Sequence, residues 1–277
     1  MNSGVSNNLN LEKLLLKSKN IRKKILQMAM EAGSSSAHIG GALSIADILS
    51  ILFFHVMTID KNDPLSDKRD RFILSKGHAC LALYAILYEK GLINKEHIET
   101  FEQSGSDLLG HPVKNRKIGI DFSTGSLGMG LSLATGVAIS LKKKSIDRKV
   151  YVVIGDGECN EGSIWESAML VPNLKLNNLV TIIDNNNFQQ TGSLDEILSN
   201  KNLAEKWSSF GWAVFEVDGH NIKEIINCFN QIKKTEKPSL IVAKTIKGKG
   251  VSFMEDNNDW HHNRLTEKLF HEAMNEM

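Results

Sequence analysis

Cysteine is scarce in this sequence, with three residues among 277. Cys80, Cys159 and Cys228 form no C-x-x-C pair, and their odd number leaves one without a partner. A disulfide framework or a zinc site is therefore not expected, and the natural setting is a reducing, cytoplasmic compartment. Cys159 is better explained as a small space-filling residue than as a nucleophile.

Long apolar runs and an excess of charge of one sign are also absent. No stretch approaches the roughly 18 apolar residues of a membrane span, and residues 1–10 are polar, unlike a signal peptide. Lys and Arg number 33 against 32 Asp and Glu, so the formal net charge is +1. Bulk charge gives no support to a nucleic-acid or membrane-surface role.

What remains is the ordinary material of a globular protein, with 42% hydrophobic and 23% charged residues. This length suffices for one large α/β domain or two small ones. Because the chain has no internal repeat, low-complexity segment or long linker, we predict a single domain over residues 1–277.

The clearest structural unit lies in the middle of the chain. Residues 150–154 are continuously apolar, as in a strand buried on both faces, and they end in Gly155-Asp156-Gly157. A helix is expected over 162–171. A second apolar run, 179–183, ends in the polar segment 184–187. This pattern predicts a βαβ unit with two parallel strands.

Shorter patterns predict further elements around this unit. Apolar residues at helical spacing over 11–32 indicate an amphipathic helix. Ser44 is a candidate N-cap for a helix over 45–55. The other expected elements are strands at 71–74, 212–217 and 239–245, and helices at 79–89, at 221–234 and from the glycine-rich 125–130 segment to 140. Together they predict an α/β fold with an open, mainly parallel sheet flanked by helices on both faces.

Polar residues follow the two central strands where ligands bind in open parallel sheets, beyond the carboxyl ends. Asp156 offers an anionic oxygen and Asn186 a neutral amide oxygen, a ligand pair that suits Mg²⁺, for which Ca²⁺ can substitute. Gly155 and Gly157 allow a sharp turn and close approach to a phosphate, and the following helix adds a favourable dipole. A G-D-G turn alone is common, but this joint placement predicts a metal bridging protein oxygens to a diphosphate.

The same residues carry a family resemblance. Gly155-Asp156-Gly157, with Asn186 placed 30 positions after Asp156, resembles the thiamine diphosphate signature, and the run from Gly155 to Gly162 resembles its transketolase version. Four further motifs occur in the order of the transketolase family: Ser75-Lys76-Gly77-His78, Gly110-His111-Pro112, Gly125-Ser126-Leu127-Gly128 and Asp218-Gly219-His220. The resemblance extends from about residue 20 to about residue 265.

The resemblance implies a role for each matching residue. Metal ligands would be the side chains of Asp156 and Asn186 and the backbone carbonyl of Phe188. Contacts to the cofactor would come from His78, Gly157, Asn186 and His261 at the diphosphate and from Gly125, Ser126 and Leu127 beside the aminopyrimidine. Glu161 would join a buried acidic network across a subunit interface. His38, His111 and His261 would line the substrate channel, with His38 and His261 moving protons or holding oxyanions.

The resemblance also implies a partner. In this family a Glu and an aromatic pocket on another domain act on the aminopyrimidine ring, and nothing in this chain resembles them. The chain is therefore similar to the N-terminal subunit of a split transketolase, completed by a C-terminal subunit in an α2β2 assembly. The implied reaction moves a two-carbon ketol unit from a ketose, with sugar phosphates as substrates.

Two alternatives stay open at this point. One is a subunit of another thiamine diphosphate enzyme, such as the α chain of a 2-oxo acid dehydrogenase, which shares the metal signature but not the Ser75–His78 or His111-Pro112 motifs. The other is a non-catalytic cofactor-binding module. Dinucleotide binding at Gly125–Gly130 has little support, because the spacing is G-x-x-G-x-G and no clear strand precedes it.

Overall fold

Five short runs rich in β-branched residues form the central sheet. The computed structural model describes residues 3–277, with side chains from residue 10 onward. The strands are β1 (Arg71–Leu74), β2 (Val150–Gly155), β3 (Leu179–Asn185), β6 (Ala213–Asp218) and β7 (Ser239–Lys244). Their order is β1-β2-β3-β7-β6, and every neighbouring pair is parallel. All five predicted strands are confirmed.

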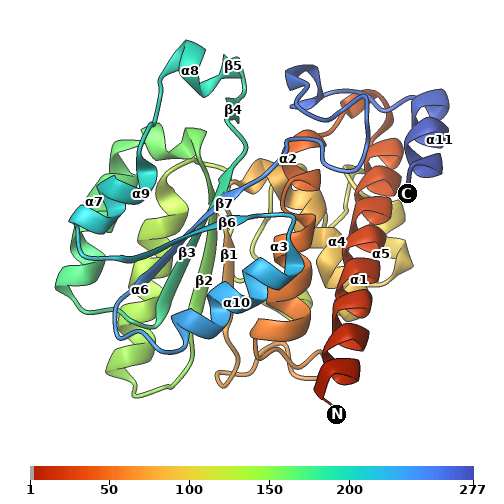
Figure 1. Cartoon of the computed structure of the whole chain (residues 1–277). Helices are drawn as coiled ribbons and strands as arrows, with labels where there is room; N and C mark the ends of the chain where they lie inside the picture. The colour runs from red at the N-terminus through yellow and green to blue at the C-terminus, as the bar shows by residue number, and fades with distance from the viewer. Residues whose placement is uncertain (1–2) are drawn as a thin grey trace.

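Helices cover both faces of this sheet (Figure 1). The helices are α1 (Ser3–Glu31), α2 (Gly40–Leu43), α3 (Ala46–Ile51), α4 (Cys80–Lys90), α5 (Lys95–Glu99), α6 (Met129–Lys143), α7 (Gly162–Asn173), α8 (Leu194–Ile197), α9 (Leu203–Ser209), α10 (Ile222–Ile232) and α11 (Glu267–Asn275). Along β2, Tyr151 and Val153 pack into the core that α1, α3, α4 and α10 share, whereas Val152 and Ile154 pack into that of α6, α7 and α9. Burial on both sides explains the continuous apolar run and confirms the predicted fold class.

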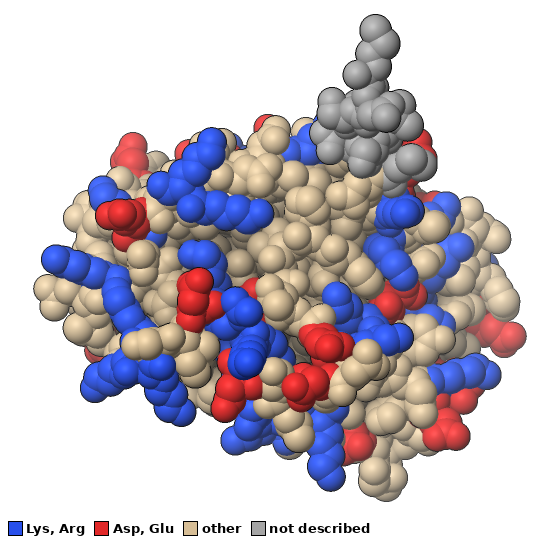
Figure 2. Space-filling model, turned by 90° about the horizontal axis from the view of Figure 1, so that it is seen from below, with Lys and Arg blue, Asp and Glu red and all other residues tan. Residues whose placement is uncertain are grey.

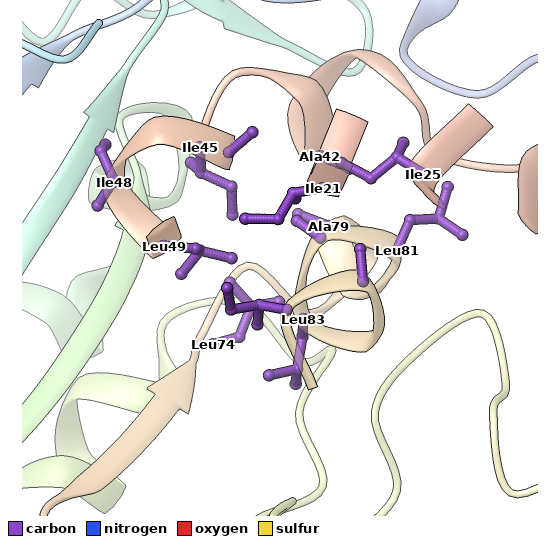
Figure 3. Close-up of a cluster of buried hydrophobic side chains, with 14 of the residues drawn as sticks. Ile21, Ile25, Ala42, Ile45, Ile48, Leu49, Leu74, Ala79, Leu81 and Leu83 are labelled. Carbon is purple, nitrogen blue, oxygen red and sulfur yellow. The ribbon is translucent and has the colours of Figure 1, made fainter. Parts of the chain in front are cut away.

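The larger core is built where α1 crosses α3 and α4 (Figure 3). Ile21 and Ile25 of α1 lie one helical turn apart and are fully buried, because the i, i+4 spacing puts them on one face. They pack into the same cluster as Leu49 of α3 and Leu81 of α4. Each such side chain contributes roughly 1.5–3 kcal/mol by its burial. This core fixes α1, α3 and α4 against β1.

Three helical predictions need correction. The N-terminal helix begins at Ser3 rather than residue 11. The predicted helix over 45–55 is α3 followed by a π-helical segment, Leu52–Val56. Ser44 does not cap α3: its hydroxyl donates to the Gly41 carbonyl and to Asp184, and the cap position, Ile45, has no side-chain bond.

Two small elements were not anticipated. β4 (Phe188–Gln189) and β5 (Gly192–Ser193) form an antiparallel hairpin that projects with α8 from the carboxyl end of β3 (Figure 1). Helix α11 packs against α1.

The surface and the cysteines agree with the composition. Figure 2 shows Lys and Arg interspersed with Asp and Glu over the face opposite the carboxyl ends of the strands. Within residues 3–277, none of the helices is long and apolar enough to cross a bilayer. Cys80, Cys159 and Cys228 are free and buried, and burial raises the pKa of the Cys159 thiol, as suits a space-filling residue. The single-domain assignment and the cytoplasmic location stay predictions.

Candidate active site

The carboxyl ends of β1, β2, β3 and β7 meet at one cavity of about 530 Å³. Of the residues that the sequence predicts for the site, eleven line it: His38, His78, His111, Gly125, Leu127, Asp156, Gly157, Glu161, Asn186, Phe188 and His261. Ser126 instead lines a smaller neighbouring cavity beside Met129 and Gly130. The cavity thus collects segments that are up to 223 positions apart, from His38 to His261.

Asp156 lies at the floor of the cavity, directly after β2. Its side chain is 1% exposed. One carboxylate oxygen accepts from the Gly157 N–H at 2.8 Å and the other from the Asn187 N–H at 2.5 Å. The carboxylate forms no ion pair within the described residues. Burial and the neighbouring charge of Asp184 raise the pKa of Asp156 to about 7.

The residues beside Asp156 complete an oxygen-rich corner. The Asn186 amide nitrogen donates to Asp184 at 2.9 Å, which orients Asn186 Oδ1 toward the turn, where it accepts from the Phe188 N–H at 3.1 Å. Asn187 has a φ of 64°, so the chain turns sharply there. No group of three or more His, Cys, Asp or Glu side chains able to hold a metal occurs in residues 3–277. A cation here would therefore rely on one carboxylate plus amide, backbone and ligand oxygens, as Mg²⁺ accepts.

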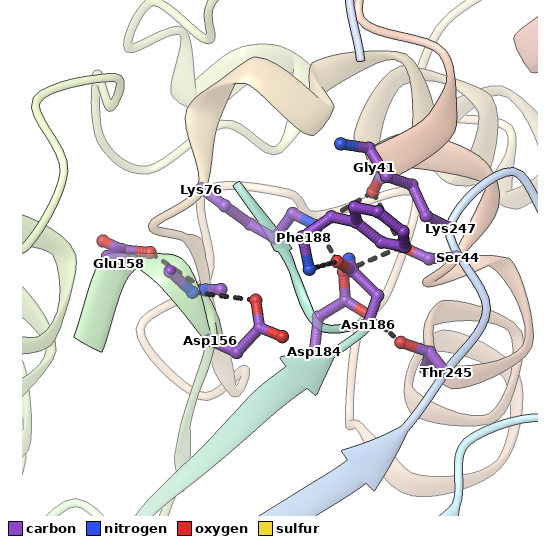
Figure 4. A network of polar contacts seen from close by, with 12 residues as sticks. Gly41, Ser44, Lys76, Asp156, Glu158, Asp184, Asn186, Phe188, Thr245 and Lys247 are labelled. Carbon is purple, nitrogen blue, oxygen red and sulfur yellow. Dashed lines mark hydrogen bonds and ion pairs between the residues drawn. The ribbon is translucent and has the colours of Figure 1, made fainter. Parts of the chain in front are cut away.

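A buried ion pair lies under this corner (Figure 4). Lys76, in the turn after β1, pairs with Asp184 near the end of β3; their side chains are 2% and 0% exposed. Asp184 also accepts from Ser44 at 2.7 Å and from Thr245. Burial alone would raise the pKa of Asp184, but the Lys76 ammonium outweighs it, and the pKa lies below its ordinary value.

Lys247 brings a second ammonium group into the cavity from the segment after β7. Its Nζ lies 2.5 Å from Asn258 Oδ1, 3.0 Å from His261 Nδ1 and 5.4 Å from the centroid of the Phe188 ring. Burial, followed by the charge of Lys76, lowers the pKa of Lys247 to about 8. The sequence prediction missed Lys76 and Lys247, although both follow expected strands.

Five imidazole rings gather at one side of the cavity. The His38 ring centroid lies 5.4 Å from those of His78 and His261, 5.8 Å from that of His111 and 4.4 Å from that of His262. Burial is the largest cause that lowers the pKa of His38 to about 4 and of His261 to about 3, and it lowers that of His78 as well. These three rings are neutral near pH 7, so each can both donate and accept a hydrogen bond.

The loop at the other side depends on glycine and on Glu158. A Cβ on Gly77 would lie 2.7 Å from the Gly125 nitrogen, and a Cβ on Gly125 would lie 2.9 Å from the His111 ring. Glu158, which is 3% exposed, accepts from the Gly128 N–H at 2.8 Å and from the Gly155 N–H at 3.1 Å. The sequence prediction missed this tie between the two glycine motifs.

Two expectations about this region change. Glu161 is exposed at the rim of the cavity in this chain, so its place in a buried network across an interface stays a prediction. The turn after Asp156 continues as a 3₁₀ segment, Gly157–Asn160, before α7 begins at Gly162. The amide groups nearest the floor of the cavity thus belong to the turn rather than to α7.

A parallel sheet with a cation-lined cavity beyond its strand ends defines a cofactor-binding α/β domain. Comparison with known proteins makes this specific: the chain belongs to the family described as transketolase, thiamine diphosphate binding domain, whose model matches residues 17–276.

Curated relatives include enzyme subunits of similar length and longer chains. The chain is 42% identical over 270 residues to one named subunit of the apulose-4-phosphate transketolase of Phocaeicola vulgatus, with 97% of this chain and 95% of that one covered. It is 42% identical to a 6-deoxy-6-sulfo-D-fructose transketolase subunit of a Clostridium species, with 93% of each covered. It is 36% identical to human transketolase, with 92% of this chain but only 41% of that protein covered.

Solved structures give the same picture. Transketolase from Campylobacter jejuni superposes with a TM-score of 0.88 at 32% identity over 94% of this chain. Transketolase from Leishmania mexicana superposes with a TM-score of 0.88 at 28% identity over 94% of this chain. The chain spans 42% and 40% of these two structures, respectively.

Proposed function

We propose that this chain is the N-terminal, cofactor-binding subunit of a two-chain transketolase. The enzyme would transfer a two-carbon ketol unit from a ketose phosphate to an aldose phosphate. The observation that carries the proposal is Asp156, a buried carboxylate without a cationic partner in the described residues, beside the Asn186 amide oxygen and in the same cavity as Lys76 and Lys247. This donor set suits a divalent cation bound to a diphosphate.

The residues present are suited to thiamine diphosphate and Mg²⁺. Asp156, Asn186 and the Phe188 carbonyl would hold the metal, and Ca²⁺ could replace it. Gly157 would allow close approach of the diphosphate, since a Cβ there would already lie 2.9 Å from Gln189. Lys247 and His78 would face the diphosphate oxygens. When bound, the cofactor supplies a carbanion that attacks a carbonyl carbon.

The histidines would act on the sugar. His38, His111 and His261 line the cavity, and the lowered pKa values of His38 and His261 keep them uncharged near pH 7. A neutral imidazole can accept a hydroxyl proton or donate a hydrogen bond to a developing oxyanion. We assign proton transfer to His38 and His261, and substrate positioning to His111. The Ser75–His78 and His111 motifs line one cavity with the metal corner, which favours the transketolase assignment over a 2-oxo acid dehydrogenase.

A second polypeptide would complete the site. The Phocaeicola vulgatus relative carries the name of an enzyme subunit, and this chain covers 95% of its length, which supports a two-chain enzyme. The partner would supply the Glu and the pocket for the aminopyrimidine, next to Gly125 and Leu127. Leu127 and Met129 are 40% and 49% exposed beside this cavity, as suits a surface that another chain covers. An α2β2 assembly is the arrangement we propose.

The test is ketol transfer from xylulose 5-phosphate to ribose 5-phosphate with thiamine diphosphate and Mg²⁺. The chain would be assayed alone and with its candidate partner, for example the product of a neighbouring reading frame. Activity that requires the partner is expected, and Asp156→Ala should abolish metal-dependent cofactor binding without loss of fold. The names of the relatives add apulose 4-phosphate and 6-deoxy-6-sulfofructose as donors to be tried. Activity of the chain alone, or unchanged cofactor affinity in Asp156→Ala, would overturn the proposal.

A further inference from the structure

The Asp218-Gly219-His220 motif has no role in the site described above. It forms the turn after β6, the edge strand that lies beside β7. His220 is not among the described residues that line the cavity. Its side chain is 13% exposed and points instead toward the segment that follows β7.

Two hydrogen bonds join this turn to the backbone leaving β7. The Gly219 N–H donates to the Lys244 carbonyl at 2.7 Å, and the Ile246 N–H donates to His220 Nε2 at 2.9 Å. A Cβ on Gly219 would lie 2.5 Å from Thr245 Cγ2, so only glycine lets the two segments approach this closely.

The bond from Ile246 fixes the tautomer of His220. A backbone N–H can only donate, so Nε2 must carry a lone pair and the ring proton sits on Nδ1. Nδ1 lies 2.8 Å from Asp47 Oδ2 and donates to it. Asp47 is 5% exposed and receives a bidentate pair from Arg22, at 3.1 and 2.6 Å. The orientation of His220 is therefore set from α3 and α1.

The same cluster also holds the far end of the segment. Arg22 Nε donates to the Lys249 carbonyl at 2.9 Å. Residues 246–249 are thus tied at one end through His220 and at the other through Arg22, and both ties meet at Asp47. Lys247 lies between them and directs its ammonium group into the cavity.

We propose that His220 is a positioning residue for Lys247: through its bond to the Ile246 N–H, it fixes the backbone that delivers the Lys247 ammonium to the diphosphate. The nature of the ligand rests on the proposed function. The mechanical link from His220 to residue 246 does not, since it follows from hydrogen bonds within the chain.

Two conservative substitutions separate the two bonds of His220. In His220→Gln, the side-chain oxygen can take the place of Nε2 and still accept from Ile246. In His220→Asn, the shorter amide lies near the position of Nδ1 and can reach Asp47 but not Ile246. The matched control is His271→Asn, on an exposed histidine of α11.

The first measurement is native-state amide exchange of the full chain. We expect the Ile246 amide to exchange about tenfold faster in His220→Asn and near the wild-type rate in His220→Gln and His271→Asn. Equal acceleration in the Gln and Asn variants, or none in either, overturns the proposal. Thermal unfolding of each variant establishes that the fold is retained.

The second measurement is a double-mutant cycle on thiamine diphosphate affinity, titrated with Mg²⁺ in the assembled pair. His220→Asn alone is expected to raise Kd about tenfold, and to have no further effect when Lys247 is already Met. Additive losses would mean that His220 does not act through Lys247. If the wild-type pair binds no thiamine diphosphate, the proposed function fails, while amide exchange at Ile246 still decides the role of His220.

Discussion

Lys76 and Asp184 form an ion pair that is almost completely withdrawn from water, with 2% and 0% of their side chains exposed. Lys76 also donates to the Gly41 carbonyl at 3.0 Å, while Asp184 accepts from Ser44, Thr245 and Asn186. The pair thus links the turn after β1 to α2, β3 and the segment after β7. It lies beneath the metal corner, so the position of Asn186 depends on it.

Breaking this pair should be costly. We expect Asp184→Asn to lower the free energy of unfolding by about 3–5 kcal/mol, because it leaves the Lys76 ammonium buried without a counter-charge. The double variant Lys76→Met, Asp184→Asn should lose less than the two single losses combined, since neither charge remains. Urea unfolding of the four proteins tests this. Glu272→Gln, in the exposed pair with Lys268, should change stability by less than about 0.5 kcal/mol, and a similarly small effect at Asp184 would contradict the prediction.

Asp156 should make the metal-free chain less stable as pH rises. Its pKa is raised from 3.8 to about 7, so between these values the folded carboxyl holds a proton that the unfolded one has lost. Stability from this group is fully present below pH 3.8 and is lost as pH rises through about 7. We expect the difference in unfolding free energy, wild type minus Asp156→Asn, to fall by up to about 4 kcal/mol from about pH 4 to about pH 8.

The control for this titration is Asp195→Asn, on an exposed carboxylate of α8. Its difference from wild type should show no such decline. A flat curve for Asp156→Asn as well would mean that this carboxylate is already compensated in the metal-free chain.

The sheet and the metal corner were predictable because their signals are local. An apolar run that stops at Gly155-Asp156-Gly157 identifies both a buried strand and the polar residue at its end. The parallel arrangement then brings Asp156 and Asn186 to one edge without further information. The carboxylate and the amide are conspicuous in sequence because they directly follow strands that are apolar throughout.

The supporting charges were not predictable, since their partners lie far along the chain. Ser44 has the residue type of a helix cap, yet its hydroxyl bonds Asp184, 140 positions away. Glu158 and Lys76 belong to the quoted motifs, but charged residues are usually exposed, and only the assembled fold shows that both are buried. Sequence therefore indicated the residues of the site better than the network that holds them.

His38 should stay uncharged well below the ordinary histidine range. Burial, followed by His262, His111 and Lys247, lowers its pKa from 6.5 to about 4. In that window the unfolded ring binds a proton that the folded ring does not, so the stability contribution is present above pH 6.5 and is lost as pH falls toward 4. NMR titration of the imidazole Cε1–H signals should show His38 unchanged at about pH 5.5, where His271 already shifts. A His38 midpoint near 6.5 would contradict the account of the cluster.

A close contact between α6 and the turn after β1 yields the most specific packing prediction. A Cβ on Gly130 would lie 2.2 Å from Ser75 Oγ and 2.8 Å from Ser75 Cα, so the helix start would have to move away from the turn. We expect Gly130→Ala to destabilise the chain by about 1–3 kcal/mol. It should also weaken cofactor binding in the assembled pair, because Ser75 bonds both Glu158 and the Gly130 N–H.

Gly136 is the matched control, on the same helix. It is exposed, and a Cβ there would meet nothing within 4 Å. Gly136→Ala should therefore stabilise the chain by about 0.5–1 kcal/mol through helix propensity, with cofactor affinity unchanged. Opposite signs for the two substitutions in denaturant unfolding would establish that contact with Ser75, rather than the glycine-to-alanine change itself, is responsible. Equal effects would mean that α6 can shift freely, and that Ser75 does not fix the start of α6.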